Sequence, residues 1–141
     1  MFKFFSRKQE SLTRADFIAL AAGLTTFIAV AFHNISKSSI WFDEAFGAYL
    51  IRFNFWDIAK YTANDVHPPL YYWLLQAWTT VFGTNELGFR SMSVFFAVIA
   101  IIFAFLLVHK WFGRRVAWVS LALMIFTPFF VRYAQEARMY T

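Results

Sequence analysis

Two adjacent carboxylates lie in a strongly apolar stretch, "IWFDEAFGAYL", which covers residues 40–50. This acidic pair, Asp43 and Glu44, could accept a proton from a reacting hydroxyl group or bind a divalent cation. Two exposed acids can also simply begin a solvated helix, where their charge interacts favourably with the helix dipole. The acidic pair alone does not decide between a chemical and a structural role.

Further polar residues lie in "NDVHPPLYYWLL", residues 64–75. Asp65 and His67 come directly before two prolines, which hold the local backbone extended and favour a helix start just after them. Alternate side chains of an extended segment point to the same side. Together with the acidic pair, these two residues could bind a divalent cation or a substrate hydroxyl, although a lone histidine is more often a hydrogen-bonded structural residue.

The chain that must position these residues has the composition of a membrane protein. Of its 141 residues, 60% are apolar, 23% are aromatic and 15% are charged, whereas soluble proteins are roughly 45–50% apolar and about 25% charged. The absence of cysteine excludes disulfides, cysteine-ligated zinc and thiol nucleophiles. The net charge of +5 does not indicate nucleic-acid binding, because the basic residues flank apolar runs.

Three apolar runs are suited to crossing a bilayer, which takes about 20 residues; they begin at Phe17, Ser91 and Val116. A fourth run, 68–82, is short, begins with two prolines, and divides on a helix into an apolar and a polar face. The polar face consists of Tyr72, Gln76, Thr79 and Thr80. This run is therefore expected to lie along the membrane surface.

The basic residues predict the orientation of the spans. Four Lys or Arg residues lie in 1–16 and three in 109–115, and such residues concentrate on the cytoplasmic side of a membrane. Three spans place both segments in the cytoplasm, whereas a fourth span at 68–82 would place 109–115 outside. A signal peptide cleaved at 29–31 is the alternative for the first run, but the later spans favour a retained anchor.

We therefore predict an all-α integral membrane protein of a prokaryotic plasma membrane, with its N-terminus inside and its active face outside. The expected segments are a cytoplasmic tail (1–16), a first span (17–36), an extracytoplasmic loop (37–90) with interfacial helices at about 43–53, 55–62 and 70–82, a second span (91–109), a cytoplasmic loop (110–115), a third span (116–134) and the start of a second outer loop (135–141).

Charged residues gather at the outer ends of these spans. Arg90 precedes the second span, and Glu136 and Arg138 follow the third. Charged groups at this depth are costly unless they are paired or have a function. We expect these three residues to share one membrane face with the acidic pair and with His67.

Four stretches now resemble a known family: "WFDEAF", "DVHPPLYYWLLQAW", "FGTNELGFRSMSVFFAV" and "RYAQEARMY". In this order and at these spacings they are similar to the N-terminal part of the GT-C glycosyltransferases that use polyprenyl-phosphate sugars, the superfamily of protein O-mannosyltransferases and aminoarabinose lipid A transferases (glycosyltransferase family 39-like). The resemblance covers roughly residues 15–141. It implies a GT-C fold with many more spans, of which this chain would be the front part.

The resemblance also implies roles for the candidate residues. Asp43 matches the catalytic aspartate and would act as the base of an inverting transfer, while Glu44 would orient Asp43 or the acceptor. The implied substrate-binding residues are Asp65, His67, Arg90, Glu136 and Arg138. His67 would contact the donor phosphate or sugar, and both arginines would meet phosphate oxygens, which suit bidentate guanidinium contacts. Glu136 would hold Arg138 in place.

The expected function is sugar transfer from a polyprenyl-phosphate donor, with membrane lipid as a partner, to an extracytoplasmic protein, lipid or cell-wall glycan. The sequence indicates no definite cofactor, and a divalent cation held by Asp43, Glu44, Asp65 and His67 stays open. One alternative is a non-catalytic small membrane protein, or an inactive truncated remnant of such an enzyme. Another is a transporter fragment, which predicts acids within the spans, and the three apolar runs contain none.

Single cysteines would test the topology, because the chain has none of its own. Cysteines introduced at Ser38 and Thr84 should react with a membrane-impermeant thiol reagent in intact cells, because both lie in the expected outer loop. A cysteine at Lys110 should react only after the membrane has been opened. Labelling at Lys110 but not at Thr84 in intact cells would reverse the predicted orientation.

Overall fold

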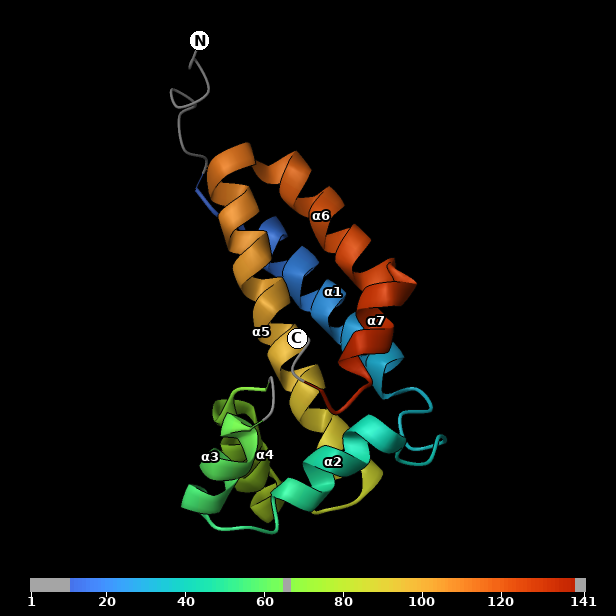
Figure 1. The fold of residues 1–141 in the computed structure, drawn as a ribbon. Helices are drawn as coiled ribbons and strands as arrows, with labels where there is room; N and C mark the ends of the chain where they lie inside the picture. The colour runs from blue at the N-terminus through green and yellow to red at the C-terminus, as the bar shows by residue number, and fades with distance from the viewer. Residues whose placement is uncertain (1–10, 65–66, 139–141) are drawn as a thin grey trace.

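The computed structural model describes residues 11–64 and 67–138, which form helices and no strand, as the expected all-α class requires. In chain order the helices are α1 (Arg14–Phe32), α2 (Phe42–Leu50), α3 (Phe55–Ala63), α4 (Pro69–Phe82), α5 (Glu86–Phe112), α6 (Arg114–Phe126) and α7 (Pro128–Ala134). Figure 1 shows α1, α5 and α6 packed side by side as a bundle, with α7 continuing from α6. Helices α2, α3 and α4 gather at one end, called here the α2–α4 end.

Apolar side chains fill the core of the bundle. Phe27, Ile101 and Phe105 are buried in one cluster to which α1, α5 and α6 all contribute. Gly23 allows α1 to approach α6 closely, because a Cβ atom there would lie 2.8 Å from the Cδ1 atom of Ile125. Many large apolar side chains on these helices face outward and are exposed. Extended apolar surface of this kind is typical of a protein that contacts a membrane.

Two helices, α1 and α5, are long and apolar enough to cross a membrane. The pair α6 and α7 also meets these criteria together, but it is bent by 62°. The described residues therefore provide two candidate spans, or three if the bent pair is one span. This count is compatible with an integral membrane protein, and the expected span boundaries stay predictions.

The helix expected over 116–134 is broken in two in the structure. The break falls at Pro128, which has no N–H to donate and whose ring clashes with the preceding turn. The loop expected at 110–115 is reduced to Gly113, because helix continues on both sides of it. Gly113 has a φ of 87°, which a residue without a side chain adopts readily.

The other helix ends differ from expectation for local reasons. Helix α1 begins earlier than residue 17, because Thr13 and Asp16 form a capping box that starts it, and it ends at Phe32 rather than at residue 36. Helix α5 is longer than 91–109, since the Asn85 side chain caps it at the Gly88 N–H. Helices α2, α3 and α4 lie within one to three residues of the ends expected for the interfacial helices.

Helix α4 turns its polar face toward the protein. Tyr72 and Thr79 are buried, and the side-chain amide of Gln76 donates to two backbone carbonyl oxygens that follow α2, at 2.7 and 2.8 Å. On the opposite face Leu70 and Val81 are 60% and 76% exposed. The division into two faces expected from the sequence is therefore present except at Thr80, which is exposed, and an orientation parallel to the membrane stays a prediction.

A buried polar cluster closes the bundle at the end opposite α2–α4. The Asp16 carboxylate accepts hydrogen bonds from the backbone N–H and the hydroxyl of Thr13, both at 2.7 Å. It also lies 3.0 Å from Arg114 Nε and accepts from the indole N–H of Trp118 at 3.1 Å. One side chain of α1 thereby holds the first turns of α6, although the sequence had placed Asp16 in the cytoplasmic tail.

Replacing Asp16 by alanine should lower the thermal stability of the purified protein in detergent. The change removes a fully buried acceptor and leaves the partly exposed guanidinium of Arg114 and indole of Trp118 without it, at an expected cost of about 1–3 kcal/mol. Lys60→Ala is a suitable control, because it breaks only the exposed pair with Asp57 and should change stability by less than about 1 kcal/mol. Equal effects of the two substitutions would show that the Asp16 cluster does not stabilise the bundle.

Candidate functional site

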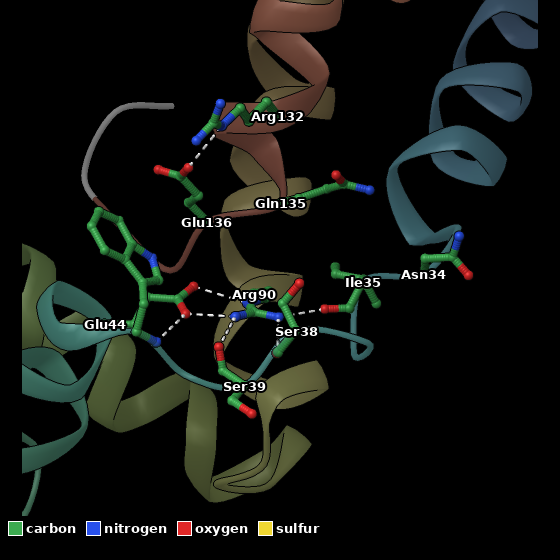
Figure 2. A pocket seen from close by; sticks show the side chains of 10 residues that line it. Asn34, Ile35, Ser38, Ser39, Glu44, Arg90, Arg132, Gln135 and Glu136 are labelled. Atoms are coloured by element: carbon green, nitrogen blue, oxygen red, sulfur yellow. Dashed lines mark hydrogen bonds and ion pairs between the residues drawn. The ribbon is translucent and has the colours of Figure 1, made fainter.

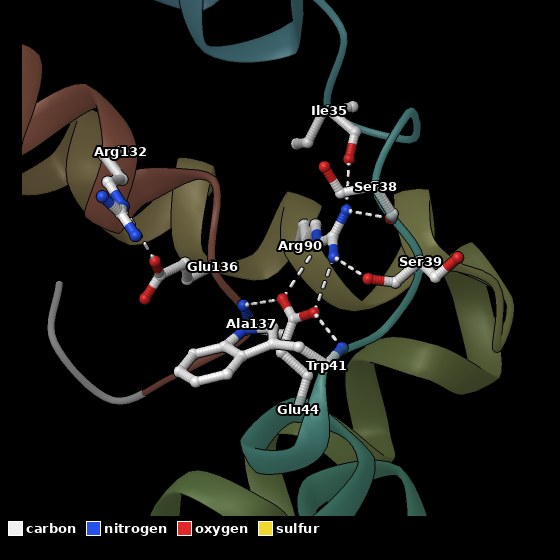
Figure 3. Close-up of polar contacts among 9 residues, drawn as sticks. All are labelled: Ile35, Ser38, Ser39, Trp41, Glu44, Arg90, Arg132, Glu136 and Ala137. Carbon is white, nitrogen blue, oxygen red and sulfur yellow. Dashed lines mark hydrogen bonds and ion pairs between the residues drawn. The ribbon is translucent and has the colours of Figure 1, made fainter.

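A buried ion pair joins α2 to α5, as Figure 3 shows. Arg90 Nη2 lies 2.6 Å from Glu44 Oε2, and Arg90 Nε donates to Glu44 Oε1 at 2.9 Å. The two side chains are only 6% and 2% exposed. Two roughly parallel bonds between a guanidinium and a carboxylate combine strength with a defined geometry.

The remaining donors of Arg90 bind the segment between α1 and α2. Nη1 donates to the carbonyl oxygens of Ile35 and Ser38 at 2.6 and 2.9 Å, and Nη2 donates to that of Ser39 at 3.2 Å. A guanidinium has five N–H groups, and with the bonds to Glu44 all of them are engaged. Arg90 therefore has no donor left for a phosphate oxygen, and the phosphate contact predicted for it finds no support in this geometry.

Glu44 is saturated in the same way. Its Oε1 also accepts from the Ala137 N–H at 2.8 Å, and its Oε2 accepts from the Trp41 N–H at 3.4 Å. The contact to Trp41 closes the first turn of α2, because Glu44 occupies the third helical position. One carboxylate thus connects the start of α2, helix α5 and the segment that follows α7. Its predicted role in orienting Asp43 stays a prediction that this position favours.

The surroundings of Glu44 keep it ionised. Burial alone raises the pKa of its carboxyl group, but the hydrogen bonds and charge of Arg90, helped by the N–H groups of Ala137 and Trp41, outweigh burial. The net effect is a pKa below the ordinary value of 4.5. Glu44 is therefore a fixed negative charge at neutral pH.

Asp43 has a different partner and a more open environment. Its Oδ2 lies 3.3 Å from Arg138 Nη2, and the side chain is 34% exposed, against 12% for Arg138. A tight charge-assisted bond is shorter, about 2.7–2.9 Å. The accessible carboxylate can accept a proton, and the guanidinium beside it can bind an anionic leaving group.

A polar pocket of about 310 Å³ adjoins the buried pair, as Figure 2 shows. Its lining includes Asn34, Ser38, Ser39, Trp41, Gln135 and Glu136. The Gln135 amide donates to the carbonyl oxygens of Ala31 and His33, at 3.0 and 3.2 Å, and so holds the end of α7 against the end of α1. Glu136 lies 3.5 Å from Arg132, and the contact between Glu136 and Arg138 stays a prediction.

Of the two remaining predicted residues, the structure describes only one. Asp65 lies outside the described residues, and His67 is half-buried just before α4. In the described ranges, 11–64 and 67–138, no three His, Asp or Glu side chains gather as a metal site would require. The two oxygens of Glu44 are occupied by protein donors, which leaves it poorly suited as a ligand. Metal binding by the four residues named from the sequence stays a prediction.

Sequence reasoning missed which charges pair with one another. Glu44 and Arg90 lie 46 positions apart, and no local pattern connects them. The available signal was the arginine itself, because a charge at the edge of an apolar run must be paired or functional. The sequence also gave no reason to choose Tyr71, whose hydroxyl is buried close to this site, among so many aromatic residues.

Comparison with known proteins gives one match. Residues 66–139, slightly more than half of the chain, match the model of the dolichyl-phosphate-mannose-protein mannosyltransferase family. The chain belongs to this family. The matched stretch contains His67, Arg90, Glu136 and Arg138, whereas the acidic pair precedes it. The family resemblance drawn from the sequence is thus confirmed, and with it a glycosyltransferase lineage; no curated protein and no solved structure matches the chain.

The low pKa of Glu44 predicts a pH-dependent stability. A carboxyl group whose pKa is lower in the folded state stabilises the protein above its unfolded pKa, and this contribution is lost as the pH falls through the folded value. Glu44→Gln should therefore cost about 3–5 kcal/mol at neutral pH, because Arg90 stays buried without a counter-charge. As the pH falls below 4.5, the difference in the midpoint of thermal unfolding between Glu44→Gln and the unmodified protein should decrease.

Glu136→Gln is the matched control for this experiment. The partner of Glu136, Arg132, has a side chain that is 80% exposed, so its loss should change stability by no more than about 1 kcal/mol. A stability difference between Glu44→Gln and the unmodified protein that is the same at every pH would contradict the assignment of Glu44 as the titrating group.

Proposed function

We propose that this chain is a membrane glycosyltransferase of the GT-C type, or the front part of one, that transfers a sugar from a polyprenyl-phosphate donor to an acceptor outside the cytoplasm. Family membership supports the glycosyltransferase lineage. The observation that carries the proposal is the accessible Asp43 carboxylate beside the Arg138 guanidinium, 3.3 Å apart. A transfer from a lipid phosphate needs both a base and a positive charge for the departing phosphate.

The proposed reaction is a single displacement with inversion. Asp43 takes the proton from the acceptor hydroxyl or amine while that atom forms a bond to the anomeric carbon of the sugar. The bond between this carbon and the phosphate oxygen breaks, and the oxygen keeps the electron pair. Arg138 stabilises the resulting lipid phosphate, because guanidinium pairs well with phosphate oxygens. The acceptor is a protein, a lipid or a cell-wall glycan.

Glu44 and Arg90 have a positioning role in this proposal. Their pair fixes the first turn of α2, on which Asp43 lies, and the Ala137 N–H bond brings Arg138 next to it. His67 and Asp65 are proposed contacts of the donor sugar or phosphate, and a divalent cation there stays a proposal. Glu136, next to the polar pocket, is proposed as a further contact of the substrate.

The proposed topology has three spans in the plasma membrane of a prokaryote. Helices α1 and α5 are the first two, and the bent pair α6 and α7 is the third. The α2–α4 end faces outward, since the basic residues of 1–16 and 109–115 favour the cytoplasm. The apolar face of α4 contacts lipid, which would cover its exposed side chains.

Asp43→Asn tests the proposed base in the protein as it is expressed in its native membrane. The substitution keeps the size of the side chain and removes its ability to accept a proton, so sugar transfer from a polyprenyl-phosphate sugar should fall by about 10²- to 10⁴-fold. Arg138→Ala should raise the donor KM and lower kcat together, because it removes both a binding contact and leaving-group stabilisation.

Asp57→Asn is the control, because Asp57 is an acid in the first turn of α3 whose partners are exposed. It should leave transfer unchanged. The abundance of each variant in the membrane must be measured in parallel. Normal abundance with near-full transfer by Asp43→Asn would show that Asp43 is not the base and that the acidic pair only begins a helix.

A further inference from the structure

Tyr71 carries a buried hydroxyl group for which no role has been assigned. The residue lies in the first turn of α4, and its ring packs against the cluster formed by Leu75, Phe89, Met92 and Ala137. The hydroxyl oxygen is covered by protein and has no partner at normal hydrogen-bond distance and angle among the residues that the structure describes, although the Ser93 hydroxyl is near enough to affect its pKa. The ring is therefore held firmly in place while the polar atom at its tip has no partner.

An unpartnered buried hydroxyl lowers the stability of a protein. It has given up its hydrogen bonds to water and has gained none in exchange, whereas most buried polar groups are satisfied. A phenylalanine at this position would keep the packing of the ring and remove the cost. Groups that keep such a cost are found where binding or catalysis supplies the missing partner.

The surroundings of this hydroxyl are those of the candidate site. Glu44 and Arg138 are close enough to change its ionisation. The charge of Glu44 is paired with that of Arg90, as described above. The other nearby charge, Arg138, lies beside Asp43. Tyr71 thus approaches the pair of Asp43 and Arg138 from α4, an element that has so far contributed no side chain to it.

The hydroxyl is a donor at every physiological pH. Burial raises the pKa of Tyr71 well above its ordinary value of 10.0, and the neighbouring Tyr72 and Glu44 raise it further. Arg138 and Ser93 act in the opposite direction but are outweighed. A protonated phenol that cannot ionise offers its hydrogen to an acceptor oxygen.

We propose that Tyr71 is a binding residue whose hydroxyl donates a hydrogen bond to a phosphate oxygen of the lipid-phosphate donor, beside Arg138. The inference rests on the proposed function and adds α4 to the site. An anionic oxygen suits this position, because the guanidinium can only donate and the protonated hydroxyl can donate to the same oxygen. The neutral sugar and the acceptor hydroxyl would instead require acceptors as well as donors.

A structural explanation for Tyr71 is a hydrogen bond with Ser93 formed by a small local shift. The Ser93 hydroxyl donates to the carbonyl oxygen of Arg138 at 3.4 Å, and its oxygen retains the capacity to accept. The two explanations differ in how Tyr71→Phe should change the stability of the protein. A structural bond makes Tyr71→Phe less stable, whereas a donor that waits for a ligand makes the ligand-free variant equally or more stable.

Tyr71→Phe in the full protein, reconstituted in lipid nanodiscs, separates these cases. The ligand-free variant should unfold at the same or a higher temperature than the unmodified protein. Its affinity for a polyprenyl phosphate should fall about 10- to 100-fold, the effect of losing one hydrogen bond to a charged group. Binding of the uncharged polyprenol should not change, and in the transfer reaction the donor KM should rise.

Tyr61→Phe serves as the matched control, because Tyr61 on α3 is 50% exposed and its removal should leave both readouts unchanged. A clear fall in the unfolding temperature of Tyr71→Phe, or an unchanged affinity for polyprenyl phosphate, would overturn this inference alone. If the unmodified protein does not bind polyprenyl phosphate more tightly than polyprenol, the proposed donor is wrong and the inference fails with it.

Discussion

The buried ion pair of Glu44 and Arg90 is the interaction on which the α2–α4 end of the molecule depends. Burying two charges is costly, and the cost is offset only when every remaining hydrogen-bonding position finds a partner. Here the guanidinium uses all five donors and the carboxylate accepts from four N–H groups. These partners come from the α1–α2 segment, α2, α5 and the chain after α7. The first two of these segments are continuous in the sequence, so three distant regions of the chain meet at two side chains.

The two neighbouring acids have different environments and therefore different roles. Glu44 is buried and holds structure, whereas Asp43, one residue earlier, is partly exposed beside Arg138. Because consecutive side chains on a helix point about 100° apart, one can face the protein while the other faces the site. The acidic pair is therefore neither a solvated helix start nor two equivalent catalytic groups.

Much of the fold could be predicted from the sequence, because its causes are local. Apolar runs marked the long helices, and the proline pair before Leu70 marked the start of α4. The bend at Pro128 was missed although the residue is visible, since the apolar pattern continues across it. Asp16 was placed in the tail because its partners, Arg114 and Trp118, lie about a hundred positions later.

The candidate site could be predicted only in part, for the same reason. Residue type and position relative to the apolar runs correctly singled out Asp43 and Arg138 as charged residues of one region, but pairing depends on tertiary contacts. Arg90 was expected at a phosphate and instead binds Glu44 and three carbonyl oxygens. Charge alone gives no information on whether a donor is already occupied.

The bend at Pro128 determines where the chain runs after α6 and so where Arg138 lies. In an α-helix each residue adds about 1.5 Å along the axis, so a straight continuation of α6 would carry Arg138 about 18 Å beyond Phe126. The bend of 62° turns α7 away from that axis, and the chain then reaches Glu44 through Ala137. A residue added within α6 would shift the start of α7 by about 1.5 Å and turn it by about 100°, whereas a residue added after Pro128 would displace Arg138 alone. The position of Arg138 beside Asp43 therefore depends on the length of α6 as well as on the bend.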